Sequence, residues 1–142
     1  MRNTSSNYWR GWLEPRFRCL VPATSFCEWT DTRPKITHWF ARDESRPLFA
    51  LAGIWRPSTG VRGPKSAPVE GEHFVFSFLT WASNALVRPI HAKAIPVILT
   101  SQDECDVWLG APEAEALKFQ GPLPNELLKI VATGEREDAL AA

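Results

Sequence analysis

The stretch Phe17-Arg-Cys-Leu-Val-Pro-Ala-Thr-Ser-Phe-Cys-Glu-Trp29 decides the fold of this chain. An apolar segment enters a Pro-Ala-Thr-Ser turn and leaves it as a short strand that carries Glu28 among aromatic neighbours. Burying a carboxylate costs several kcal/mol unless the group is paired or its pKa rises, so a buried glutamate often marks a working site. The alternative is that Glu28 faces solvent from a half-buried strand. From this stretch alone the two interpretations weigh equally.

Length and composition predict one globular domain. The chain has 142 residues, 44% of them hydrophobic, and seven are tryptophan, which favours a packed core over disorder. Sixteen basic and sixteen acidic residues cancel, so no overall charge indicates a polyanionic partner. A local basic groove on a neutral protein is compatible with this balance, and nucleic acid therefore stays open as a partner.

Cysteine usage and hydropathy predict a cytoplasmic protein. The three cysteines, Cys19, Cys27 and Cys105, are odd in number and have no CxxC spacing. Without a signal peptide, this pattern indicates reduced thiols in a cytosolic chain. No apolar run reaches the roughly 18 residues that a transmembrane helix needs, so no membrane partner is expected.

Outward from the opening stretch, the pattern predicts strands first and helices late, which is a β-rich α+β domain. Residues 56–73 are rich in Gly, Pro and Ser and are expected to form a long flexible loop. Gly53 marks a bulge or a close backbone approach. No repeat or domain boundary is visible, so residues 1–142 form one domain that ends in a frayed tail over residues 133–142. Strands are expected at 18–21, 26–29, 36–41, 47–55, 74–80, 94–99 and 127–131, and helices or helical turns at 7–13, 83–87, 101–109 and 112–119.

Three histidines are candidates for acid–base chemistry. His38 lies in a predicted strand with alternating apolar and polar residues, and His73 adjoins the expected loop. Both positions favour a structural or solvated role over a catalytic one. His91 differs, because it sits between a proline-containing loop and an irregular strand, where side chains often point into clefts. Histidine can act as a general acid or base near neutral pH. Glu28 and His91 therefore form a plausible acid–base pair.

Motifs for metals and cofactors do not occur in the sequence. There is no HxxH, HExxH or paired-cysteine spacing for a metal ion, and no glycine-rich loop for a nucleotide. A GxSxG motif is also missing, which argues against a serine hydrolase of that type. The sequence predicts neither a metal nor a cofactor.

Four blocks of sequence have the order and spacing of a known family. They are Arg18-Cys-Leu-Val-Pro-Ala-Thr-Ser-Phe-Cys-Glu28-Trp29, Pro47-Leu-Phe-Ala-Leu-Ala-Gly-Ile-Trp55, Phe78-Leu-Thr80 and Ile90-His91-Ala-Lys-Ala-Ile-Pro-Val-Ile-Leu99. Together they resemble the SOS-response-associated peptidase (SRAP) family, the abasic-site processing proteins, from about Arg2 to Leu109. The resemblance implies a compact β-rich α+β domain with a barrel-like sheet and short flanking helices.

The resemblance also implies a function in the SOS response and DNA repair. Family members bind abasic sites in single-stranded DNA and cross-link to them through an N-terminal cysteine, whose amine forms a Schiff base and whose thiolate closes a thiazolidine ring. By residue match, Glu28 would shuttle protons and His91 would protonate the sugar oxygen. Thr80 would contact the DNA backbone and Arg2 would pair with a phosphate. The expected partner is single-stranded DNA containing abasic sites, bound by a monomer.

The start of the sequence departs from the family pattern. The family begins Met-Cys-Gly-Arg, whereas residue 2 here is arginine and Cys19 and Cys27 lie in the interior without a free α-amine. A catalytic asparagine and a DNA-stacking tryptophan of the family belong to a preceding portion. The segment after Leu109 also differs. We therefore expect an N-terminally shortened member that is inactive in cross-linking, and the sequence leaves open whether the chain is an enzyme.

Two other functions stay open. One is a non-catalytic module for single-stranded DNA, in which aromatic rings stack on bases. The other is a hydrolase that uses Glu28 and His91 as acid and base, as the family's peptidase name suggests. Salt-dependent DNA affinity without a covalent adduct would favour the first, and proteolysis abolished by Glu28→Gln the second. The phosphate contacts of the binding module would be Arg2, Thr80, Arg88 and Lys93.

Overall fold

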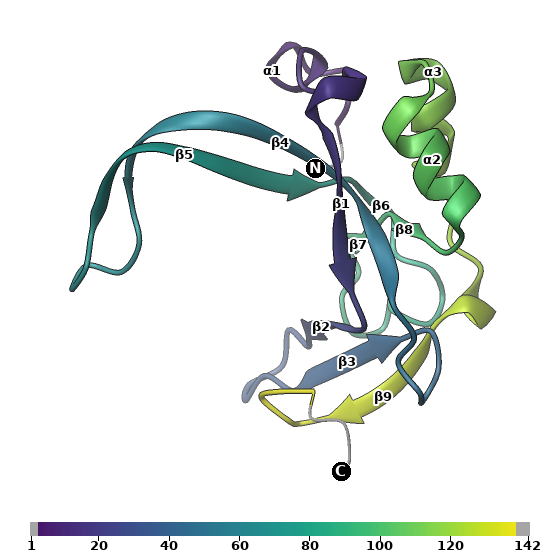
Figure 1. The fold of residues 1–142 in the computed structure, drawn as a ribbon. Helices are drawn as coiled ribbons and strands as arrows, with labels where there is room; N and C mark the ends of the chain where they lie inside the picture. Colours follow the sequence, from purple (N-terminus) through teal and green to yellow (C-terminus); the bar gives the residue numbers. More distant parts are fainter. Residues whose placement is uncertain (1–2, 139–142) are drawn as a thin grey trace.

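The computed structural model describes residues 3–138 and shows a strand-rich domain with short helices (Figure 1). This confirms the α+β class. No helix of the described part is long and apolar enough to span a membrane. The strands are β1 (Arg18–Ala23), β2 (Phe26–Trp29), β3 (Thr37–Ala41), β4 (Phe49–Arg62), β5 (Val69–Phe78), β6 (Thr80–Trp81), β7 (Ile95–Pro96), β8 (Ile98–Leu99) and β9 (Lys129–Thr133). The helices are α1 (Asn7–Arg10), α2 (Gln102–Gly110) and α3 (Glu113–Ala116), with 3₁₀ turns at Pro15–Phe17, Leu117–Phe119 and Asn125–Leu127.

The strands form three antiparallel sheets. The largest has the order β1-β4-β5, with β8 also paired to β4, the second has the order β2-β3-β9, and β6 and β7 make a small third sheet. The opening stretch is strand, turn and strand as predicted, but β1 and β2 enter different sheets, so the turn between them joins the two. None of these sheets closes within residues 3–138. The barrel-like part of the prediction is therefore not confirmed.

The loop expected over residues 56–73 is instead a two-stranded ribbon. β4 continues to Arg62 and β5 begins opposite it at Val69, so the connection is confined to residues 63–68. Figure 1 shows the ribbon curving away from the rest of the domain. Gly60 and Gly71 face each other across it, both with positive φ. The Gly- and Pro-rich composition is typical of a loop, and for that reason it predicted one. In the structure, the backbone groups of these residues are hydrogen-bonded across the two strands, which composition alone does not predict.

The core lies on both faces of β4. Successive side chains of a strand point to opposite faces, so Ala50, Ala52 and Ile54 join one cluster while Phe49 and Leu51 join the other. This explains why the sequence reads as an unbroken apolar run there. The first cluster also holds Leu13, Leu79, Val97, Leu99, Trp108 and Ala116, and the second also holds Phe40, Val87, Ile95, Ile98 and Leu128.

Arg18 joins β1 to the end of α2 from inside the protein. The residue is 5% exposed, and its guanidinium donates to the carbonyl oxygens of Leu13 (2.7 Å), Trp108 (2.9 Å) and Ala111 (2.7 Å). The last two carbonyls lie at the C-terminus of α2, where a cation is favoured by the helix dipole. At the other end of α2, Ser101 provides the N-cap through a capping box with Glu104.

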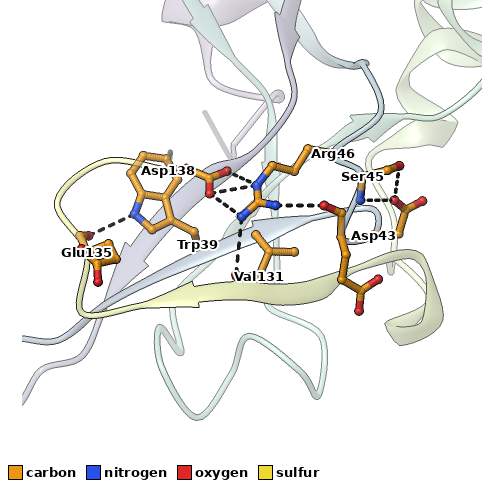
Figure 2. A network of polar contacts seen from close by, with 8 residues as sticks. Trp39, Asp43, Ser45, Arg46, Val131, Glu135 and Asp138 are labelled. Carbon is orange, nitrogen blue, oxygen red and sulfur yellow. Dashed lines mark hydrogen bonds and ion pairs between the residues drawn. The ribbon is translucent and has the colours of Figure 1, made fainter. Parts of the chain in front are cut away.

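The C-terminal segment is fastened to the second sheet (Figure 2). The Asp138 carboxylate accepts hydrogen bonds from Nε (2.8 and 2.9 Å) and Nη2 (2.7 Å) of Arg46, and the two side chains are 4% and 11% exposed. Nε1 of Trp39 donates to the Glu135 carbonyl oxygen (3.1 Å). The expectation of a frayed tail is therefore wrong for residues 133–138, because a partner distant in sequence holds Asp138. Residues 139–142 lie outside the described residues.

Candidate functional site

Glu28 on β2 meets His91 in the loop before β7. Oε2 of Glu28 lies 3.4 Å from Nδ1 of His91, and the two side chains are 20% and 28% exposed, respectively. The alternative in which Glu28 simply faces solvent does not describe the structure. The two residues proposed as an acid–base pair from the sequence are therefore neighbours in space.

The register of β2 explains where Glu28 points. β2 pairs with β3 so that Phe26 lies opposite Phe40 and Glu28 opposite His38. Residues 26 and 28 share a face of the strand, and the Phe26 ring stacks on the buried Phe40 ring with centroids 5.4 Å apart. Because Phe26 belongs to the core face, Glu28 is directed inward as well.

The loop that carries His91 is held by backbone contacts. The His91 N–H donates to the Val87 carbonyl oxygen (2.8 Å), and the His91 carbonyl accepts from the Ser83 hydroxyl (2.6 Å). The Asn84 side-chain oxygen accepts from the Val87 N–H (3.1 Å), much as an N-cap residue does. Val87 itself is fully buried. A buried anchor thus sets the position of His91.

Glu28 and His91 open into a pocket of about 300 Å³ that Thr80 also lines. Thr80 reaches it because β6 pairs with β7, with Thr80 opposite Pro96. Three of the four residues selected from the sequence therefore surround one cavity. Arg2, the fourth, lies outside the described residues. The other residues of the pocket wall are Ala23, Ser25, Phe26, Cys27, Leu51, Phe78, Ala94, Ile95 and Pro96.

Burial sets the electrostatics of the pocket. It raises the pKa of the Glu28 carboxyl above the ordinary range, and the charge of His91 opposes that shift. Burial also raises the pKa of the Cys27 thiol, and the neighbouring Glu28 charge adds to the effect. Glu28 therefore holds a proton at a pH where an exposed carboxyl would have lost it, while Cys27 remains a thiol.

Among the residues of the pocket wall that were not selected from the sequence, Ser25 and Cys27 carry polar or reactive side chains. Ser25 lies in the turn between β1 and β2 and hydrogen-bonds Asp138 of the C-terminal segment. No local pattern could have indicated this link, because Asp138 is distant in sequence. Strand alternation predicts that Cys27 points away from the face of Glu28, but the structure places Cys27 in the wall of the same pocket.

The remaining histidines have structural contacts, as the sequence predicted. A ring nitrogen of His38 lies 3.2 Å from the Thr133 hydroxyl, and one of His73 lies 3.1 Å from the carbonyl oxygens of Gly60 and Val69. Within residues 3–138, no group of three or more His, Cys, Asp or Glu side chains is placed to hold a metal ion.

Comparisons of sequence and of structure find known proteins that are similar to this chain. Two curated relatives, the abasic site processing proteins YoqW of Bacillus subtilis (strain 168) and of Bacillus phage SPbeta, are each 33% identical over 93 residues, which is 65% of this chain. The chain spans 38% of their length. A crystal structure of a protein from Bordetella bronchiseptica has the same fold, with a TM-score of 0.69 at 20% identity over 92% of this chain and 60% of that one. A model of the SOS response associated peptidase (SRAP) family matches residues 3–135, and the chain therefore belongs to that family.

Proposed function

We propose that this protein binds single-stranded DNA at abasic sites and opens the sugar ring there by acid–base catalysis in the Glu28–His91 pocket. The observation that carries the proposal is the 3.4 Å approach of these two side chains in a cavity that Thr80 also lines. The names of the curated relatives support the substrate, because both are called abasic site processing proteins.

The chemistry divides between the two side chains. An abasic sugar closes as a hemiacetal, in which C1′ carries a hydroxyl and is bonded to the ring oxygen O4′. The Glu28 carboxylate accepts the hydroxyl proton while the C1′–O4′ bond breaks, and protonated His91 donates its proton to O4′. The products are the C1′ aldehyde and a 4′ hydroxyl. Because the pair lies within 3.4 Å, the proton can return from Glu28 to His91 and reset the site.

The raised pKa of Glu28 suits this role. A general base is most effective when its pKa lies near the working pH, and burial moves this carboxyl in that direction. The charge of His91 opposes this upward shift of the Glu28 pKa and favours the ionised carboxylate.

DNA phosphates belong at the rim of the pocket, because the Glu28 carboxylate repels them from its interior. Thr80 offers a hydroxyl donor there, and Arg88 is exposed on the loop just before His91. Such contacts position a strand without reading its sequence. The resemblance adds Arg2 as a phosphate partner.

The test measures how fast an abasic aldehyde is captured by a small alkoxyamine. The substrate is single-stranded DNA with one abasic site, and the 142-residue chain is added at saturation. We expect the wild type to accelerate oxime formation, and Glu28→Gln and His91→Gln to lower the rate about a hundred-fold or to the uncatalysed level. Thr80→Val should weaken affinity and leave the saturated rate unchanged. Glu70→Gln, at an exposed carboxylate on β5, is the matched control.

A DNA-binding module without catalysis is the second candidate. Exposed Arg88 and Lys93 on either side of His91 favour it. In that case the wild type would bind abasic and undamaged strands with a salt-dependent affinity, and aldehyde capture would proceed at the rate of free DNA. That combination would contradict the catalytic proposal.

A further inference from the structure

A second hollow lies between α1 and the β4–β5 ribbon. Its volume is about 200 Å³, and we call it the aromatic hollow. Its wall is built mainly from Tyr8, Trp12, Trp55, Phe76, Arg56 and Arg62. None of the described residues in this wall is Asp or Glu. The hollow shares no residue with the Glu28–His91 pocket.

The aromatic rings of this region are unusually exposed. Tyr8 is 55% exposed and Phe76 64%, and Phe74, next to Phe76 on the same face of β5, is 73% exposed. The Phe74 ring meets the Trp55 ring edge to face at 5.6 Å, so the rings form a connected array. Clustered apolar side chains left in water mark surfaces that bind a partner.

The arginines of the hollow favour an anionic partner. The Arg56 guanidinium lies 5.4 Å from the centre of the Tyr8 ring and 5.5 Å from that of Trp12, so both rings hold it in place. Within residues 3–138, neither Arg56 nor Arg62 forms an ion pair with a carboxylate. Cations fixed beside exposed rings match a ligand that combines phosphates with planar bases.

A second copy of the chain fits this surface less well. A two-fold interface would bring the same patch of each copy together. It would gather Arg56 and Arg62 of both copies at one interface, where none of the described residues of the hollow is an Asp or Glu that could pair with them. Like charges brought together at an interface are strongly unfavourable. The charge of the hollow therefore points to nucleic acid over self-association.

We propose that the aromatic hollow binds the single-stranded DNA that flanks the abasic site, with bases stacked on Phe76 and Tyr8 and a phosphate beside Arg62. The inference rests on the proposed function for the position of the abasic site. Phe76 in the hollow and Thr80 in the pocket are four residues apart, which is about 13 Å along extended chain. One strand can therefore occupy both sites.

The test uses undamaged single-stranded DNA, so that it does not depend on chemistry at the abasic site. Fluorescence anisotropy would compare oligonucleotides of about 4 and about 16 nucleotides. Phe76→Ala should weaken binding of the longer one at least about five-fold, and Phe76→Tyr should restore it. Arg62→Ala should lower the slope of log affinity against log salt by about one. Val61→Ala, on the same ribbon, and Arg136→Ala, on the C-terminal segment, are exposed controls that should change neither quantity.

Two outcomes would overturn the inference. In the first, Phe76→Ala and Arg62→Ala leave affinity and salt slope unchanged. In the second, Val61→Ala is as damaging as Phe76→Ala and light scattering shows a concentration-dependent dimer, which would mean that the surface joins two copies. Failure of the proposed function looks different, because aldehyde capture would then be lost while binding of undamaged DNA stays sensitive to Phe76 and insensitive to Glu28→Gln.

Discussion

Replacing Arg18 by methionine should destabilise the protein by about 3 kcal/mol. The side chain is nearly fully buried and donates to three carbonyl oxygens. A hydrogen bond to a charged group contributes about 1.5–3 kcal/mol, so the gross loss is several kcal/mol. Part of it is offset, because Nη2 of Arg18 has no hydrogen-bond partner among residues 3–138 and burial lowers the pKa of the guanidinium. Methionine fills most of the volume, which limits any cavity.

Urea unfolding followed by tryptophan fluorescence measures this change, since Trp108 packs beside the replaced group. Arg18→Lys keeps the charge but cannot reach three acceptors at once, and we expect a loss of about 2 kcal/mol. Arg16→Met is the control. Arg16 is exposed, pairs with Glu14 at the surface and lies over the Phe17 ring, and its replacement should change stability by less than about 0.5 kcal/mol. A loss below about 1 kcal/mol for Arg18→Met would refute the account of α2 docking.

Two further predictions concern a close contact and a titrating group. In Gly53→Ala, the new Cβ would lie within 2.8 Å of Sγ and 3.0 Å of the carbonyl oxygen of Cys19. A thermal melt should therefore show a loss of about 1–3 kcal/mol in the free energy of unfolding. Gly110→Ala is the control, because no described atom lies within 4 Å of the Cβ that it would add. Hydrogen bonds from Arg46 lower the pKa of the Asp138 carboxyl in the folded protein. The ionised carboxylate therefore stabilises the fold at any pH above its unfolded pKa of about 3.9. That stabilisation is lost as the pH falls through the lower pKa of the folded state. Urea midpoints from pH 7 to about pH 2 should show that acid loss in the wild type and not in Asp138→Asn, and parallel curves for the two proteins would contradict it.

Local patterns in the sequence were sufficient for the opening stretch and for α2. A turn between two apolar segments predicted β1 and β2, and the helix expected over residues 101–109 corresponds to α2. These local patterns do not show which strand β1 or β2 pairs with. The β4–β5 ribbon was missed for the same reason, since its cross-strand pairs stabilise a segment whose composition alone is that of a loop.

Local context made Glu28 and His91 candidates, and the resemblance assigned each of them a role. Glu28 and His91 are far apart in the chain, and no spacing rule connects a strand glutamate to a loop histidine. Matching four blocks to one family added Thr80 and Arg2 to the two candidates, and the structure brings Glu28 and His91 within 3.4 Å of each other. The hydrogen bond between Ser25 of the pocket wall and Asp138 could not be predicted from the sequence, because the two residues are far apart in the chain.

The most direct test of the central claim is the rate of aldehyde capture at an abasic site in single-stranded DNA, compared between saturating wild type and saturating Glu28→Gln. If Glu28 and His91 open the sugar ring together, the wild type accelerates capture and the variant loses about a hundred-fold of that acceleration while still binding the strand. Equal rates for the two proteins would contradict the claim.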